Sequence, residues 1–305
     1  MRILICGAGA MGCLFGGYLS RAGHEVWLLS HWKEQMARIR AQGLLLHSFG
    51  GQRWRVPMRV VSYEEPLPEN VKVAFICVKS YATGTAAEKA IKRLAPDGVA
   101  ITLQNGLGNR EQLAQVVGAS RALLGVTSNG ATLLGVGEVR HAGIGLTHLA
   151  AEPNRAAATR IAEMLTDAGF SCQVDEEIDA VVWGKLLINV GINALTAILR
   201  VPNGALADYE SSRQLLRAAV EEGAAIARAK GISIVEDPVE RTLAVARATA
   251  TNRSSMLSDI QRGARTEIEV INGAIVREGA ALGLPTPVNE ILTRLVRALE
   301  AKMAL

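Results

Sequence analysis

The sequence predicts an α/β N-terminal domain with a Rossmann-type doubly wound sheet, followed by an all-α C-terminal domain. The chain has 305 residues, which is too many for one ordinary core. Short apolar segments alternate with amphipathic ones through the first half, as expected for strand–helix–strand units. From about residue 178 onward the pattern is almost wholly helical. We therefore expect two domains, residues 1–176 and residues 177–305.

The first half contains five short apolar segments that we expect to form buried strands. They are RILIC (2–6), EVWLL (25–29), VAFICV (73–78), VAITL (99–103) and ALLGVT (122–127). Helical patterns such as AMGCLFGGYLSRAG and AAEKAIKRLAP lie between several of them. A glycine-rich stretch, residues 135–150, indicates a hairpin, and residues 158–169 indicate another helix. This order favours a parallel sheet covered by helices.

The second half is expected to consist of helices punctuated by prolines. The helical patterns cover residues 178–199, 210–230, 238–261 and a long region from 265. The prolines that separate them are Pro202, Pro238, Pro285 and Pro287.

Composition excludes several classes of function. The net charge of +4 is small for this length, and its Lys and Arg are mixed with Asp and Glu, so no nucleic-acid partner is expected. No stretch of about 18 uninterrupted apolar residues predicts a membrane span. The apolar N-terminus is broken early by glycines, which favours a strand–turn–helix over a signal peptide. Cysteines without a C-x-x-C pair predict reduced thiols, a cytoplasmic protein and no metal site.

The motif GAGAMG follows the first expected strand directly and opens a helix. Its residues are Gly7, Ala8, Gly9, Ala10, Met11 and Gly12. In a dinucleotide fingerprint the first glycine permits a tight turn, the second admits the pyrophosphate, and the third allows close helix–strand packing. The N-terminus of the helix then offers free N–H groups to the phosphates. This context predicts a dinucleotide-binding site.

The end of the second strand bears on the choice of cofactor. NAD-binding sites usually place a carboxylate here for the ribose 2′-hydroxyl, whereas this strand end carries Ser30, His31 and Lys33. Hydroxyl and cationic groups suit a 2′-phosphate, so NADP is favoured over NAD, although solvated loop residues would look the same. Lys79 and Asn105 follow two further strands and are expected to contact cofactor or substrate, or else to be solvated loop tips.

The stretch WGKLLINVGINALTA places three polar side chains on an apolar helix. Lys185, Asn189 and Asn193 recur every four residues and so share one face. A lysine can supply both a proton and a positive charge to a developing alkoxide, and the amides can orient a substrate. Alternatively, the lysine snorkels to solvent and the asparagines cap loops.

A second polar cluster lies between residues 251 and 273. Asn252, Ser254 and Ser255 could bind a carboxylate, and Glu267 could pair with Lys185 or with a ribose hydroxyl. Equally, Asn252 and Ser254 could cap a helix, and Glu267 could lie on the surface of an amphipathic helix. Spacing alone does not decide between these interpretations.

The chain resembles the ketopantoate reductase family over nearly its full length. The resemblance is carried by GAGAMG, CVKS around Lys79, QNGLGN around Asn105, WGKLLINVGINALTAI, PNG at 202–204, NRSSMLSDI and TEIEVING. It implies NADPH-dependent reduction of 2-dehydropantoate to (R)-pantoate in pantothenate and coenzyme A biosynthesis. The partner would be a small 2-keto acid.

The resemblance also implies roles for individual residues. Lys185 would be the proton donor, and Glu267 would lie by the cofactor ribose and near this lysine. The substrate's hydroxyl end and carbonyl region would be contacted by Asn189, Asn193 and Asn203. Residues 252–255 would hold the carboxylate, and the cofactor would be touched by Lys79, Asn105 and Ala131. The polar stripe would then form the substrate-facing wall of a cleft between the two domains.

One departure from the family pattern concerns the second strand. The family often has an arginine near its end, whereas His31 stands there with Lys33 nearby, so selectivity for NADP over NAD is open. Two alternative hypotheses are also enzymes: a reductase of another 2-keto acid and a 3-hydroxyacid dehydrogenase of the same architecture. A hypothesis of another class is a non-enzymatic NADP-sensing regulator. The helical half could form a homodimer, but its amphipathic faces could also pack within one chain.

Overall fold

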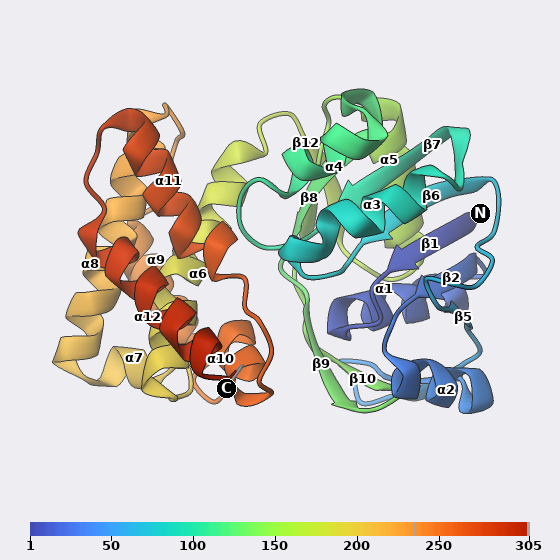
Figure 1. The fold of residues 1–305 in the computed structure, drawn as a ribbon, viewed down its shortest axis with the longest axis horizontal. Helices are drawn as coiled ribbons and strands as arrows, with labels where there is room; N and C mark the ends of the chain where they lie inside the picture. The colour runs from blue at the N-terminus through green and yellow to red at the C-terminus, as the bar shows by residue number, and fades with distance from the viewer. Residues whose placement is uncertain (235, 304–305) are drawn as a thin grey trace. The chain divides into compact units, whose positions relative to one another are not determined.

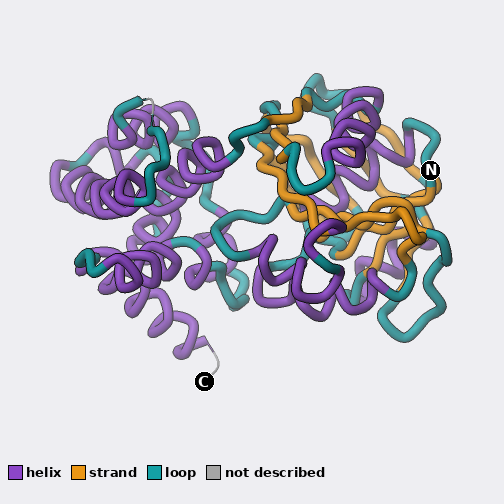
Figure 2. The backbone as a smooth tube through the Cα atoms, turned by 90° about the horizontal axis from the view of Figure 1, so that it is seen from above, coloured by secondary structure: helices purple, strands orange, loops and turns teal. Residues whose placement is uncertain are grey.

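A computed structural model describes residues 1–234 and 236–303. The chain divides into two compact units. The first comprises residues 1–104 and 108–178, and the second comprises residues 105–107 and 179–305. Among the described residues every strand lies in the first unit (Figure 2).

The first unit is built on an eight-stranded sheet whose strand order is β12-β11-β8-β7-β6-β1-β2-β5 (Figure 1). Neighbouring strands are parallel except for β8 and β11, which pair antiparallel. The strands are β1 (Arg2–Cys6), β2 (Glu25–Leu29), β5 (Arg59–Val61), β6 (Val71–Ile76), β7 (Leu94–Thr102), β8 (Ala122–Thr127), β11 (Thr147–Ala150) and β12 (Cys172–Asp175). The Rossmann-type fold predicted from the sequence is confirmed.

Helices cover both faces of this sheet because its central strands are apolar on both sides. In β1, Ile3 and Ile5 belong to the core beneath α1 and α5, whereas Leu4 and Cys6 belong to the core beneath α3 and α4. The helical segments of the unit are α1 (Ala10–Arg21), α2 (Lys33–Gln42), η1 (Ser80–Ala82), α3 (Thr83–Ile91), α4 (Asn109–Val117), η2 (Ala119–Arg121) and α5 (Arg155–Asp167).

A second, four-stranded sheet also packs in this unit, in the order β4-β3-β10-β9. Its strands are β3 (Leu44–His47), β4 (Arg53–Val56), β9 (Gly130–Gly135) and β10 (Glu138–Gly143). One face packs against α1 through Leu44, Leu46, Val56 and Val139. The hairpin expected within residues 135–150 is wrong, because β10 pairs with β9 and β3, whereas β11 belongs to the eight-stranded sheet. The strands β3, β4 and β9 were not predicted.

The second unit is helical and is organised around one long apolar helix, α6 (Asp179–Leu199). Of the helices in the described ranges, α6 is the one long and apolar enough to cross a membrane by composition. It packs against α8, α9, α10 and α12, so it serves as the core helix of this unit. The remaining helical segments are α7 (Ala205–Asp208), α8 (Glu210–Ala229), α9 (Pro238–Ala248), α10 (Ser255–Gln261), η3 (Ile268–Val270), α11 (Asn272–Leu282) and α12 (Pro287–Met303).

The predicted helix over residues 238–261 is wrong, because two helices occupy this range. The Asp237 side chain caps α9 by accepting from the Val239 N–H at 2.8 Å. The Ser254 side chain caps α10 by accepting from the Leu257 N–H at 3.0 Å. The segment between them, residues 249–254, turns the chain so that both helices reach α6.

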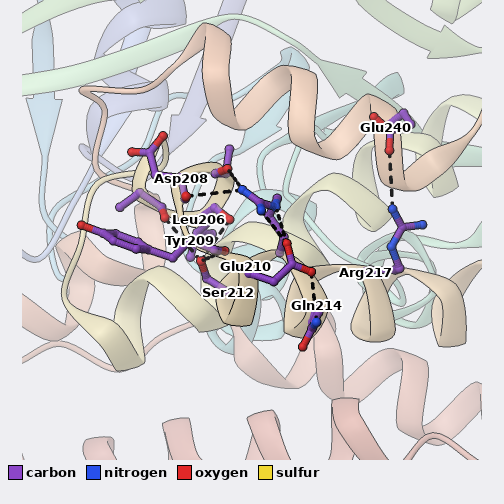
Figure 3. A network of polar contacts seen from close by, with 11 residues as sticks. Leu206, Asp208, Tyr209, Glu210, Ser212, Gln214, Arg217 and Glu240 are labelled. Carbon is purple, nitrogen blue, oxygen red and sulfur yellow. Dashed lines mark hydrogen bonds and ion pairs between the residues drawn. The ribbon is translucent and has the colours of Figure 1, made fainter.

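Polar side chains hold the start of α8 against its neighbours (Figure 3). Ser212 Oγ lies 2.9 Å from the Tyr209 carbonyl oxygen and 3.2 Å from that of Leu206. Farther along α8, Arg217 reaches Glu240 of α9 at 3.6 Å. Since that ion pair is exposed, it contributes little to stability, and the apolar core carries the packing.

Candidate functional site

The glycine-rich turn after β1 leaves room for a phosphate. Gly7 has φ +115°, and a Cβ there would lie 2.8 Å from the Cys77 carbonyl oxygen. A Cβ on Gly12 would lie 1.9 Å from the Gly7 carbonyl oxygen, whereas one on Gly9 would meet nothing within 4 Å. The first helix begins at Ala10 with no side-chain cap and no acidic residue in its first turn. The backbone is thus closed where Gly7 and Gly12 pack and open at Gly9, which fits a dinucleotide pyrophosphate.

This turn lies where the strand order of the sheet reverses. The strand β1 is flanked by β2 on one side and β6 on the other, which is the position at which doubly wound sheets bind ligands. Lys79 follows β6 and precedes η1 at the same edge. Gln104, after β7, donates from Nε2 to the Val78 carbonyl oxygen at 2.6 Å and so fixes the segment that carries Lys79. No pattern in the sequence pointed to Gln104.

The end of β2 presents two exposed cationic or titratable side chains. His31 and Lys33 are exposed, and the His31 ring lies 6.2 Å from that of Tyr63. Ser30 is buried, and its Oγ accepts from the Trp32 N–H at 3.1 Å. Its hydroxyl therefore stabilises the turn that follows β2. Ala131 lies on β9, half-buried against the same core as Met11.

The structure confirms one helix for the polar stripe in the second unit. Asn193 is 5% exposed, and Lys185 and Asn189 are half-buried on the same helix α6. The Nδ2 atoms of Asn189 and Asn193 are both buried, and no atom within residues 1–234 or 236–303 accepts a hydrogen bond from either. An unsatisfied buried donor costs about 1–3 kcal/mol, so two of them on one helix face call for an acceptor brought by a ligand.

The surroundings of Lys185, the first residue of the stripe, lower the pKa of its amine. Burial lowers the pKa of Lys185 to about 8, and the Glu267 carboxylate opposes this shift by raising the pKa. Glu267 is 7% exposed and directly precedes η3. A lysine with a pKa near 8 exchanges a proton readily near neutral pH while its ammonium form still predominates.

Residues 105–107 belong to the helical unit, although the residues before and after this segment belong to the sheet unit. The Leu107 N–H donates to the Val270 carbonyl oxygen at 2.9 Å. Gly106 has φ +87°, and a Cβ there would lie 2.3 Å from the same carbonyl oxygen. The segment 105–107 is therefore attached to the segment that follows Glu267, which places Asn105 with the residues of the second unit.

The remaining residues expected to bind substrate lie around the start of α10. The Asn203 N–H donates to the Asn252 carbonyl oxygen at 3.0 Å, and Gly204 has no room for a Cβ beside Ala250. Ser254 is 6% exposed, whereas Asn252 and Ser255 are exposed. Backbone pairing thus joins the PNG turn at 202–204 to the segment preceding α10.

The Ser254 hydroxyl is oriented by one donor and one acceptor. It accepts from the Leu257 N–H at 3.0 Å and lies 2.7 Å from Thr196 Oγ1. Thr196 Oγ1 also lies 2.8 Å from the Ile192 carbonyl oxygen, which can only accept, so the Thr196 proton is directed there. Ser254 therefore donates its own proton to Thr196 Oγ1 and keeps a lone pair free to accept. Thr196, one turn beyond Asn193, was not identified from the sequence. Within the described part of the chain, the buried side-chain donors without a partner are the two amides of Asn189 and Asn193, which suit a ligand carrying carboxylate or carbonyl oxygens.

A glycine-rich turn of dinucleotide-binding type and a buried lysine whose pKa is lowered to about 8 are typical of a nicotinamide-dependent oxidoreductase. Residues 3–154 match the family described as "Ketopantoate reductase PanE/ApbA", and residues 177–300 match its C-terminal counterpart. The chain belongs to the ketopantoate reductase family, whose curated members are oxidoreductases acting on a CH–OH group. The resemblance found in the sequence is confirmed.

Individual relatives support the same assignment. A 2-dehydropantoate 2-reductase of Halobacterium salinarum is 39% identical over 97% of this chain and 98% of its own. A ketopantoate reductase structure from Ralstonia eutropha has a TM-score of 0.92 at 33% identity and covers both chains completely. A D-mandelate dehydrogenase, solved with NADH and anilino(oxo)acetate, has the same TM-score and coverage at 28% identity.

Proposed function

We propose that this chain reduces 2-dehydropantoate to (R)-pantoate with NADPH, as a cytoplasmic step toward pantothenate and coenzyme A. The names of the curated relatives support the substrate. The observation that carries the proposal is the pair of buried, unpaired amide donors beside Lys185. These donors cost stability in the protein alone, and a substrate rich in oxygen acceptors removes that cost.

The residues of the first unit fit the cofactor. The open position at Gly9 and the uncapped start of α1 would hold the pyrophosphate. Ser30, His31 and Lys33 would face the ribose 2′-phosphate, and Lys79 and Ala131 would line the same site. When bound, NADPH supplies the hydride that is added to C2 of the keto acid.

The residues of the second unit supply the proton and the orientation. Lys185 donates a proton to the C2 oxygen, and Glu267 keeps the amine charged while it lies in a dry environment. With a pKa of about 8, roughly nine-tenths of the amine is protonated at pH 7. Asn189 and Asn193 donate to the carbonyl and carboxylate oxygens, and Asn105, Asn203, Asn252, Ser254 and Ser255 complete the substrate contacts.

A second candidate is NADH-dependent reduction of an aryl 2-keto acid. It is favoured by the equal structural similarity to D-mandelate dehydrogenase and by the absence of an arginine at residues 30–33. The two candidates share the lysine and differ in what the substrate carries beyond C2.

The test is a substrate panel with both reduced cofactors. Purified protein is assayed with NADPH or NADH against 2-dehydropantoate, phenylglyoxylate and simple 2-keto acids, by following the absorbance of the reduced nicotinamide. The highest kcat/KM is expected for 2-dehydropantoate with NADPH, and Lys185→Ala is expected to lower kcat by orders of magnitude with little change in NADPH affinity. A higher kcat/KM for phenylglyoxylate would overturn the substrate assignment, and full activity of the variant would overturn the role of the lysine.

A further inference from the structure

The side-chain amide of Asn203 is satisfied at one end only. Its Nδ2 donates to Thr249 Oγ1 at 2.9 Å. Its Oδ1 is buried and receives no hydrogen bond from the residues that the structure describes. Asn203 therefore differs from Asn189 and Asn193, because its unpaired atom is an acceptor and theirs are donors.

Thr249 determines which atom of the Asn203 amide has no hydrogen-bond partner. Thr249 Oγ1 lies 2.7 Å from the Val245 carbonyl oxygen, which can only accept, so the hydroxyl proton is directed there. The hydroxyl oxygen can then only accept from Asn203, so the amide must present its NH2 group to it. A flipped amide would place two acceptors 2.9 Å apart, which is unfavourable.

The backbone also leaves Asn203 little freedom. Its N–H donates to the Asn252 carbonyl oxygen at 3.0 Å, and the Gly204 N–H donates to the Ala250 carbonyl oxygen at 3.1 Å. A Cβ at position 204 would lie 2.6 Å from the Ala250 Cβ, so the turn is packed tightly onto the end of α9. Because the turn and the amide are both fixed, the unpaired Oδ1 of Asn203 keeps a single orientation.

We propose that Thr249 is a specificity-determining residue that holds Asn203 as a hydrogen-bond acceptor, so that the site selects 2-keto acids carrying a hydroxyl group. The inference rests on the proposed function and narrows it to a substrate class. A buried acceptor without a donor rejects a ligand that lacks the hydroxyl, because the acceptor then stays unpaired. 2-Dehydropantoate brings such a hydroxyl, whereas 3,3-dimethyl-2-oxobutanoate has the same carbon skeleton without it.

The kinetic test compares these two substrates in matched variants. Thr249→Val removes the hydroxyl at nearly constant shape, Thr249→Ser restores it, and Thr242→Val is the control. Thr242 lies on α9, which Thr249 directly follows, and its hydroxyl also donates to the carbonyl four residues back, Pro238 O at 2.7 Å, rather than to Asn203. Thermal unfolding is measured for each variant to confirm that it is folded.

The kcat/KM for 2-dehydropantoate is expected to exceed that for the deoxy analogue by about tenfold or more in the wild type, Thr249→Ser and Thr242→Val. In Thr249→Val the amide can turn, and the ratio is expected to fall to about threefold or less. An unchanged ratio in Thr249→Val, or a ratio near one in the wild type, would overturn the inference while leaving the reductase activity standing.

A binding measurement separates this inference from the proposed reaction. Pantoate and its 4-deoxy analogue are titrated calorimetrically into the protein with oxidised cofactor. Tenfold tighter binding of pantoate, lost in Thr249→Val, would support hydroxyl selection even if NADPH were not oxidised with 2-dehydropantoate, which would overturn the proposed reaction alone. Failure of both ligands to bind the wild type would overturn both.

Discussion

Replacing Glu267 with glutamine should move the alkaline limb of the pH–rate profile to lower pH. The Glu267 carboxylate is the group that raises the pKa of Lys185 against the effect of burial. Without that charge, the pKa of Lys185 should fall from about 8 by about one unit, the lower end of what a nearby opposite charge contributes. Lysine is the proton donor only below its pKa, so turnover is lost as the pH rises through that value.

The size of the effect follows from the two pKa values. At pH 8 about half of Lys185 is protonated in the wild type and about a tenth in Glu267→Gln, so kcat should fall roughly fivefold. At pH 6 the amine is protonated in both proteins, and the protonation effect disappears. The assay is kcat at saturating NADPH and 2-dehydropantoate from pH 5.5 to 10, which removes any change in cofactor affinity.

Glu269→Gln provides the matched control. Glu269 lies two residues from Glu267 on η3, but its carboxylate pairs with Arg297 at 2.6 Å on the surface. Its removal should leave the alkaline limb near pH 8. If the limb of Glu267→Gln coincides with that of the wild type, Glu267 does not hold the charge on Lys185 and the proposed acid is wrongly assigned.

Three further substitutions test separate parts of the site. Asn193→Leu removes a buried unpaired amide, so the free energy of unfolding should rise by about 1–3 kcal/mol while kcat/KM falls at least about tenfold; lower stability in denaturant titrations would contradict this. Gly9→Ala should fold with an unchanged melting temperature but bind NADPH weakly, whereas Gly12→Ala should fail to fold, and equal behaviour of the two would refute the geometry of the turn. His31→Arg should raise the NADPH/NADH ratio of kcat/KM about tenfold, because guanidinium binds phosphate in a bidentate manner; an unchanged ratio would place the 2′-phosphate elsewhere.

Local sequence signals predicted the parts of the fold that depend on them. The glycine turn at residues 7–12 and the strands around it are specified by neighbouring residues, and β1 and β2 have the predicted bounds. The stripe on α6 could be predicted because helical spacing alone places Lys185, Asn189 and Asn193 on one face.

Features that depend on contacts distant in sequence could not be predicted in the same way. The attachment of residues 105–107 to the helical unit depends on Val270, far along the chain. The strands β3 and β4 are four residues each, too short for a periodic pattern. No proline or glycine marks the break after α9, because residues 249–254 contain neither. From the sequence, Ser254 could either bind a carboxylate or cap a helix, and in the structure it caps α10. The contacts of Thr196 and Thr249 arise from tertiary packing, and the spacing of residues in the sequence does not predict them.

The most direct measurement is a crystal structure of the protein with oxidised cofactor and pantoate. We expect Lys185 Nζ within hydrogen-bonding distance of the C2 oxygen, and the Nδ2 atoms of Asn189 and Asn193 donating to ligand oxygens. A bound ligand that leaves both amides unpaired, with the amine directed into solvent, would contradict this expectation.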